Sequence, residues 1–229
     1  MGKSGNGDPK CYSFRIALDL RCGGGSEMSA VMSADTFLSD VANHQLTIKL
    51  DNGLHRHLVF RAKTNSWNMW FEIVTWPGSL IVHGDMGSWT FSRLEDMFQF
   101  FRDDKLRINS DYWAEKLQQG FHGGRDAARV FSEDLFKQRL LEQLTEYYAL
   151  EGDQLKTVTE ALHEDVLNQD GKYDLLIAAR DFKSGKFQFD TCELPSGKQY
   201  AYHFIWCLYA IVWGIQQYDS MCARTVGVR

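Results

Sequence analysis

The chain has 229 residues, of which 44% are hydrophobic and 14% aromatic, and its formal net charge is −5. This length and composition are typical of an ordered globular protein and exclude a disordered tail. The negative charge argues against a general nucleic-acid-binding protein, because such proteins neutralise phosphates with an excess of lysine and arginine.

Cysteine usage and apolar runs indicate where such a chain would reside. Five cysteines are scattered without a CxxC pair, which is unlike a disulfide framework or a zinc site. The first ten residues, MGKSGNGDPK, contain no apolar signal core. The longest apolar run, residues 204–215, is too short to span a bilayer. The sequence therefore predicts a cytoplasmic protein that does not enter a membrane.

The N-terminal part begins with glycine-rich segments around one predicted strand. Residues 12–20 alternate apolar and polar side chains, as a half-buried strand does. Ser33 is then placed to cap a helix that extends to about Asn43, with Asp35 near its positive N-terminal end. We expect Phe37, Leu38 and Val41 to form the buried stripe of this helix.

A meander of consecutive strands follows, at residues 46–50, 54–61, 68–76, 79–84 and 88–91. Asp51-Asn52-Gly53 is a hairpin signal because Asn and Gly tolerate positive φ, and Pro77-Gly78 fits the centre of a type II turn. Connections this short require antiparallel neighbours, since parallel strands need a long crossover.

The central predicted strand carries apolar side chains on both faces. Phe71 and Ile73 share one face, while Trp70, Val74 and Trp76 share the other. This pattern predicts helices on both sides of the sheet. The alternative is an exposed aromatic platform for bases or for a protein partner.

The second half of the chain is predicted to be mainly helical. Ser92, with Glu95 three residues later, resembles a capping box ahead of Leu94, Met97, Phe98 and Phe101. Further helices are expected at residues 112–119, in an acidic region broken near Gly152, and at residues 202–218, where side chains are apolar on nearly every face. Residues 174–180 and 186–190 are expected to return to strands around a Ser184-Gly185 turn.

These elements predict an α+β fold: an antiparallel meander of four to six strands packed with helices, including a buried C-terminal helix. No linker divides the chain convincingly, so residues 1–229 are taken as one domain. A possible subdivision separates a sheet-rich part, residues 1–104, from a helix-rich part, residues 105–229.

Histidines on the predicted strands offer one candidate site. His55 and His57 are two residues apart and therefore point to the same face, and His83 and Asp85 repeat this spacing on another strand. Imidazoles and a carboxylate on one face could bind zinc, manganese or iron. The alternative is the polar outer side of a one-sided sheet, with His83-Gly84-Asp85 forming a tight turn.

The acidic helical region offers a second candidate. Residues 132–165 contain nine acidic residues against three basic ones. Glu142 and Glu146, and likewise Glu160 and Glu164, are spaced to place like charges together on a helix. Such rows are ordinarily a solvated face, but they can also imitate phosphates and occupy a basic nucleic-acid channel.

Three blocks of the sequence resemble an uncharacterised protein family of bacteriophages, prophages and other mobile elements. The blocks are WFEIVTWPGSLIVHGDMGSWTFSRLEDMFQFFR, INSDYWAEKLQ and FIWCLYAIVWGIQQYD, and the similarity extends over residues 37–219. The most distinctive part is the WPG…GDMG…DMFxFF pattern. This resemblance implies a phage or prophage protein that acts in the cytoplasm of a bacterial host, and it transfers no activity, cofactor or catalytic residue.

Two functions follow as expectations. The first is an interaction protein, such as an anti-CRISPR-like inhibitor of a host defence system. It would bind a host protein or nucleoprotein complex through Glu142, Glu146, Glu160 and Glu164, without a cofactor or direct nucleic-acid contact. The alternative is a metal-dependent phosphoesterase or nuclease-like hydrolase built on His55, His57, His83 and Asp85.

Overall fold

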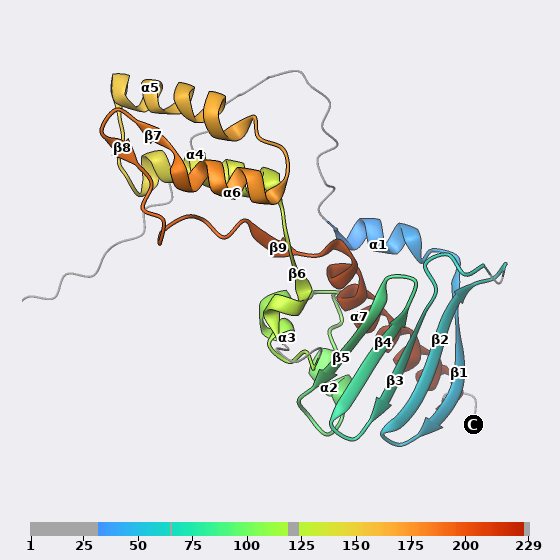
Figure 1. Cartoon of the computed structure of the whole chain (residues 1–229). Coiled ribbons are helices and arrows are strands. Elements are labelled where there is room, and N and C mark those ends of the chain that lie inside the picture. Colours follow the sequence, from blue (N-terminus) through green and yellow to red (C-terminus); the bar gives the residue numbers. More distant parts are fainter. Residues whose placement is uncertain (1–31, 65, 119–123, 227–229) are drawn as a thin grey trace, which may run out of the picture. The chain divides into compact units, whose positions relative to one another are not determined.

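The computed structural model describes residues 32–64, 66–118 and 124–226, so the strand predicted at residues 12–20 lies outside the described residues. The fold is α+β, as predicted. Five strands form one antiparallel sheet in chain order: β1 (His44–Asn52), β2 (His55–Ala62), β3 (Phe71–Trp76), β4 (Ser79–Gly84) and β5 (Gly87–Ser92). Figure 1 shows these strands side by side, with the C-terminal helix passing behind them.

The tight turns of the meander fall where the sequence predicts them. Gly53 and Gly78 have φ values of 62° and 82°, which glycine adopts without a steric cost. Gly84 meets a different constraint. A Cβ at this position would lie 2.2 Å from the carbonyl oxygen of Trp70, which also accepts the N–H of Asp85 at 3.0 Å. The close approach of these two backbone segments therefore requires glycine.

One face of the sheet is buried by helices. Helix α7 (Tyr202–Val226) packs against it, and the short α1 (Ala34–Asp40), capped by Ser33 as predicted, packs against α7 through Phe37. The rings of Phe60 and Phe71 stack 4.6 Å apart beneath α7, and Trp206 meets Phe71 edge-on at 5.6 Å. Gly214 allows this approach, since a Cβ there would lie 2.6 Å from Ile73 Cδ1. The predicted buried C-terminal helix is confirmed.

The other face of the sheet is not covered in the way that the sequence predicts. Burial alternates along β3: Phe71, Ile73 and Thr75 are buried, whereas Val74 is half-buried and Trp76 is 38% exposed. The expectation of helices on both faces was therefore wrong. The alternation is that of an antiparallel sheet with one packed and one open face. We call the side that carries Val74 and Trp76 the open face.

A β-bulge moves one apolar residue to the open face. Strict alternation would place Leu50 with Leu46 and Ile48 on the packed face. The register between β1 and β2 shifts between Ile48 and Leu50, so that Leu50 pairs with His57 and is 49% exposed. A bulge inserts one extra residue and reverses the facing of those that follow, which no periodicity in β1 signals.

The helix after the sheet begins later than predicted. Helix α2 (Met97–Phe101) is capped by Asp96, whose carboxylate accepts the N–H of Phe98 at 3.0 Å. Ser92 does not form the predicted capping box, because it still belongs to β5 and its hydroxyl donates to the carbonyl of Gly78 at 2.7 Å. Met97, Phe98 and Phe101 are buried as expected, whereas Leu94 is 42% exposed.

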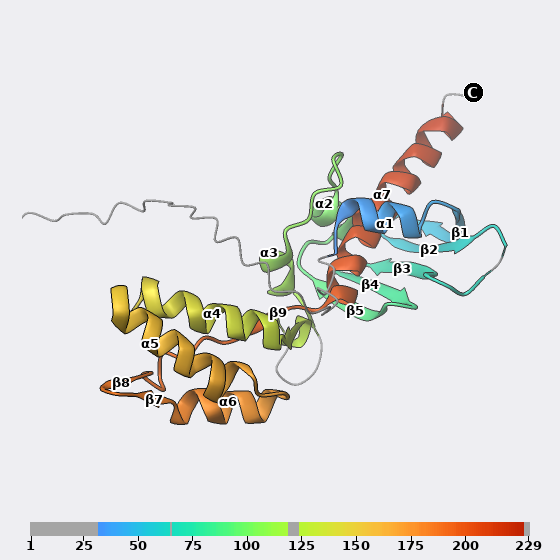
Figure 2. The ribbon, with the colours of Figure 1, turned by 90° about the horizontal axis from the view of Figure 1, so that it is seen from above.

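The remaining elements include a second helical group with its own hydrophobic core. After α3 (Ser110–Ala114), strands β6 (Arg129–Phe131) and β9 (Lys198–Tyr200) pair with each other. Between them lie α4 (Glu133–Glu146), α5 (Gly152–Leu162) with a π-helical turn (His163–Leu167), and α6 (Lys172–Asp181). Figure 2 shows α4, α5 and α6 together. Their core is distinct from the sheet core, which contains α7. The two cores thus do not follow a division at residue 104.

The strand predicted at residues 174–180 was wrong, since this segment belongs to α6. Leu175 and Ala179, four residues apart, are the buried positions of that helix. A run of apolar residues this short fits either period, and packing against the helical core decides between them. The predicted Ser184-Gly185 turn does form: it joins β7 (Lys183–Ser184) to β8 (Phe187–Gln188), and Gly185 has a φ of 61°.

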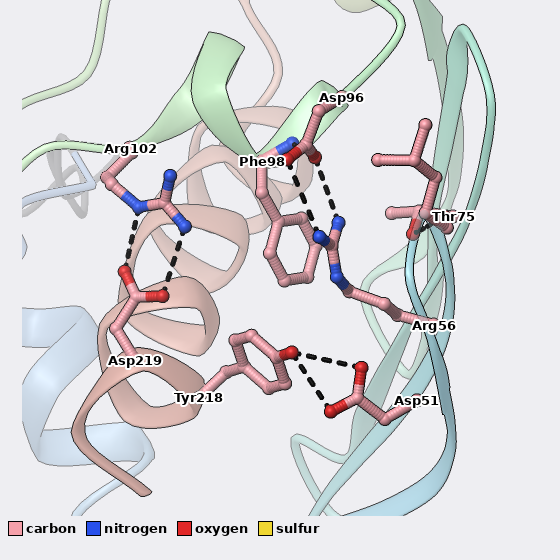
Figure 3. A network of polar contacts seen from close by, with 9 residues as sticks. Asp51, Arg56, Thr75, Asp96, Phe98, Arg102, Tyr218 and Asp219 are labelled. Carbon is pink, nitrogen blue, oxygen red and sulfur yellow. Dashed lines mark hydrogen bonds and ion pairs between the residues drawn. The ribbon is translucent and has the colours of Figure 1, made fainter. Parts of the chain in front are cut away.

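A polar network fastens β2 to α2 and α7 (Figure 3). Arg56 donates to the carboxylate of Asp96 at 2.9 Å, and its guanidinium lies 4.5 Å from the centre of the Phe98 ring. Both charged side chains are largely buried, with exposures of 11% and 17%. Arg102 pairs with Asp219 at 2.8 Å, but these side chains are about 40% exposed. Removing one partner of the first pair therefore costs more stability than removing one partner of the second.

The network also shifts the pKa values of Asp96 and Tyr218. Burial by itself raises the pKa of the Asp96 carboxyl, but hydrogen bonds from Arg56 and from the N–H of Phe98 outweigh it, so the pKa is lower than usual. Burial, together with hydrogen bonds to Cys222 and Asp51, raises the pKa of Tyr218 to about 12. The Tyr218 hydroxyl donates to Asp51 at 3.0 Å.

The close contact at Gly84 makes a direct prediction. We expect Gly84→Ala to lower the free energy of unfolding by about 3 kcal/mol, because the clash is with a backbone carbonyl that cannot rotate away. Gly185→Ala is the control: no atom lies within 4 Å of its Cβ, so only the positive φ opposes it, at about 1 kcal/mol. Denaturant unfolding measures both. Equal losses would contradict the contact.

The two ion pairs can be compared by matched substitutions. Asp96→Asn keeps a capping side chain but removes the charge opposite Arg56, and we expect a loss of about 2 kcal/mol. Asp219→Asn removes the exposed pair and should cost at most about 1 kcal/mol. Urea denaturation at neutral pH distinguishes them, and a larger effect at Asp219 would refute this ranking.

The lowered pKa of Asp96 gives the wild type a specific dependence on acid. Its charge contributes stability above the unfolded-state pKa of about 4, and this contribution is lost as the pH falls through the lower folded-state pKa. The stability difference between the wild type and Asp96→Asn should therefore begin to shrink below about pH 5 and continue to shrink as the pH falls through the lower folded-state pKa. A difference that stays constant over this range would show that charge is not its source.

Candidate functional site

The candidate metal ligands occupy different parts of the sheet. His55 is exposed at the start of β2, opposite Asn52. His57 lies on the open face, where its Nε2 is 2.9 Å from Oε2 of Glu72 on β3. His83 lies directly opposite Glu72 in the register of β3 and β4, with its ring edge-on to Trp70 at 5.5 Å. Glu72, which the sequence did not single out, is the residue between the two histidine strands.

Asp85 is engaged in a structural contact. Its Oδ2 accepts the N–H of Met69 at 2.9 Å, while its own N–H donates to Trp70. Met69 has a φ of 56°, a rare value for a residue with a side chain, and Asp85 stabilises that conformation. The alternative interpretation of His83-Gly84-Asp85 as a tight turn is consistent with these contacts.

The metal-site hypothesis gains no geometric support. Within residues 32–64, 66–118 and 124–226, no three His, Cys, Asp or Glu side chains come together as a group that could hold a metal ion. His55, His57, His83 and Asp85 therefore do not form a shared coordination sphere in this part of the chain.

The four glutamates of the acidic surface are all exposed. Glu142 and Glu146 belong to α4, Glu160 to α5 and Glu164 to the π-helical turn that follows α5. None forms an ion pair with another described residue, although Glu142 accepts a hydrogen bond from Gln138 at 2.8 Å. Hydrogen bonds in the π-helical turn run from residue i to i+5, so Glu160 and Glu164 are not spaced as they would be on a regular α-helix.

Two of these glutamates border a groove at the C-terminal end of α4. The groove has a volume of about 380 Å³, and its lining combines the two carboxylates with an aromatic ring, a proline and two further polar side chains: Arg139, Glu142, Gln143, Glu146, Tyr147 and Pro195. Gln143 donates to the carbonyl of Glu193 at 2.6 Å. Tyr147 is 58% exposed, and the negative charge of Glu193 raises its pKa.

A larger groove, of about 590 Å³, lies on the open face where β1, β2 and β3 meet the segment that joins β2 to β3. Its lining includes Lys49, Arg61, Lys63, Trp67 and Trp70, a basic and aromatic set that the sequence does not predict. Trp67 lies before the predicted strand, and Lys49 is the residue at the bulge. Two features of the sequence could have indicated this groove. Trp67 lies close to Arg61 and Lys63 in the chain, and an exposed aromatic platform on the sheet was one of the alternatives.

Cys207 is not a candidate nucleophile. It is buried in α7, where its thiol donates to the carbonyl of Met86 at 3.6 Å, and burial raises its pKa strongly. A thiol in such surroundings behaves as a small apolar side chain.

No helix among the described residues is long and apolar enough to cross a membrane; this includes α7, with 25 residues.

Comparison of the chain with protein-family models, with curated proteins and with solved structures found no match. The resemblance to a phage and prophage family therefore stays a prediction.

Proposed function

We propose that this protein is a binding protein that acts through the groove at the C-terminal end of α4 and the glutamates around it. The observation that carries this proposal is the combination of Tyr147, 58% exposed, with the exposed carboxylates of Glu142 and Glu146 in one groove. Tyrosine is enriched among the residues that dominate protein interfaces, because it adds a large rigid contact area with a polar end.

The electrostatics of this surface favour a basic partner. Glu142 and Glu146 are one helical turn apart on α4, and neither forms an ion pair with a described lysine or arginine, although Arg139 also lines the groove. Uncompensated charges at an interface raise the association rate with an oppositely charged partner and reject partners of like charge. Glu160 and Glu164 extend the negative potential of the helical group.

The resemblance to phage and prophage proteins suggests which basic partner would matter. A mobile element benefits from blocking a host defence complex, and such complexes hold nucleic acid in positively charged channels. An anti-CRISPR-like inhibitor acting in the bacterial cytoplasm is the form of this function that we propose. The choice of target depends on the resemblance, whereas the basic character of the partner depends on the groove.

Charge reversal at α4 tests the proposal. We expect Glu142→Lys combined with Glu146→Lys to weaken binding of the isolated partner at least 10-fold, mainly through a slower association rate. The partner would first be captured from host lysate and then measured in purified form by surface plasmon resonance. Tyr147→Ala should weaken the same complex without changing its dependence on salt.

Two controls separate this groove from general acidity. Asp174→Lys reverses an exposed acidic residue on α6, and Glu160→Lys with Glu164→Lys reverses the charges outside the groove. We expect the first to leave affinity unchanged and the second to reduce it less than the α4 pair does. Equal effects of all three variants would show that the α4 groove is not the binding site.

A further inference from the structure

The open-face groove has a charge opposite to that of the whole chain. Lys49, Arg61 and Lys63 line it together with a single carboxylate, Glu72, and Glu72 is already hydrogen-bonded to His57 at 2.9 Å. Lys49 and Lys63 are exposed, and neither forms an ion pair with a described residue. In a chain with a net charge of −5, this concentration of cations fits an anionic ligand.

Backbone geometry contributes to this concentration. Lys49 lies at the bulge between Ile48 and Leu50, and bulges redirect side chains relative to a regular strand. Lysine on an edge strand such as β1 also discourages pairing with other chains, which would account for Lys49 alone. It does not account for Lys63, which lies beyond the end of β2, or for the tryptophans beside it.

Trp67, Trp70 and Arg61 form one corner of the groove, which we call the Trp67–Arg61 corner. Trp67 and Trp70 meet edge-on with ring centres 5.0 Å apart, and the guanidinium of Arg61 lies 3.5 Å from the centre of the Trp67 ring. Trp67 nevertheless remains 62% exposed, the largest exposed fraction of any described tryptophan. Tryptophan normally buries most of its surface, so an exposed indole held in place by two neighbours is suited to stacking a planar ligand.

We propose that this groove binds a nucleotide unit, with the base stacked in the Trp67–Arg61 corner and the phosphate held by Lys49 and Lys63. Aromatic rings and guanidinium planes both stack bases, and lysine ammonium groups neutralise phosphates. A volume of about 590 Å³ is within the range of small-ligand sites. The ligand can be a free nucleotide or one nucleotide of a single strand, since both present the same chemistry.

This proposal is independent of the α4 groove and differs from the expectation that the protein makes no nucleic-acid contact. That expectation follows from the net charge of the whole chain, whereas binding depends on the local field. The open-face variants below leave Glu142, Glu146 and Tyr147 unchanged, so the two proposals fail separately.

The test is a titration of the full chain at low salt with two probes. Binding of AMP is monitored by tryptophan fluorescence, and binding of fluorescein-labelled oligothymidine by fluorescence anisotropy. We expect Trp67→Ala to weaken binding roughly 10-fold, within the range measured for loss of one stacked base. Trp76→Ala is the control, because Trp76 is 38% exposed on the same face but does not line this groove.

Lysine variants test the phosphate contact. Lys49→Gln with Lys63→Gln should weaken binding and, with the oligonucleotide, reduce the salt slope by about 0.7 for each phosphate that is no longer neutralised. Lys156→Gln, an exposed lysine on α5, should change neither. Circular dichroism of each variant verifies that it is folded, and Trp67→Phe, which retains a ring, should recover part of the affinity that Trp67→Ala removes.

The outcomes distinguish the sources of the ligand. If the protein binds AMP but not oligothymidine, the ligand is a free nucleotide. If it binds oligothymidine, whether or not it also binds AMP, the ligand is a single strand. Absence of binding of both probes to the wild type overturns the proposal. The proposal is also overturned if Trp76→Ala and Lys156→Gln weaken binding as much as the groove variants do.

Discussion

The packing of α7 against one face of the five-stranded sheet is the interaction on which the rest of the structure depends. A meander of five antiparallel strands cannot remain folded without burying one of its faces. Helix α7 supplies the apolar cover from the far end of the sequence, with Trp206 and Trp213 meeting Phe71 and Phe60. The sheet therefore acquires its core only after the C-terminal helix is available, since more than a hundred residues separate β5 from α7.

The same packing defines where function can reside. With α7 on one face of the sheet, the other face keeps half-buried apolar residues, a histidine–glutamate pair and the basic aromatic groove. The polar network of Arg56 and Asp96 joins the packed face to α2 and faces away from this groove, because Arg56 and His57 are neighbours on a strand and point to opposite sides. The stabilising network and the proposed binding groove thus use alternate residues of the same strand.

Much of the fold could be predicted because local chemistry decides it. Ser33 caps α1, Gly53 and Gly78 occupy turns, and α7 is apolar enough to be recognised as a buried helix. The errors arise where long-range contacts decide between two acceptable local choices. Both Ser92 and Asp96 can cap a helix, and pairing of β5 with β4 commits Ser92 to the sheet. The errors at Leu50 and at α6 have the same origin. A bulge overrides the strand period at Leu50, and packing against the helical core overrides the apparent strand period of residues 174–180.

The candidate sites were less predictable than the fold. Exposure of Glu142 and Glu146 could be anticipated from their charge, but the groove that they share with Tyr147 and Pro195 depends on a segment about fifty residues downstream. Trp67, Lys49 and Arg61 come from three separate stretches: the bulged pairing of β1 with β2 brings Lys49 and Arg61 to the open face, and the segment between β2 and β3 adds Trp67. The turn between β1 and β2 could be predicted from the sequence, whereas the bulge at Lys49 could not.

The pairing of β6 with β9 has a consequence for the history of the chain. Because Phe131 lies opposite Lys198, and the N–H of Ser132 donates to the carbonyl of Gly197 at 2.9 Å, the helical segment between them leaves and returns at adjacent points. A segment with neighbouring ends and its own hydrophobic core can be excised or grafted as a cassette, with a short hairpin closing the gap. A chain could therefore keep the sheet and α7 while carrying an entirely different insert between β6 and β9.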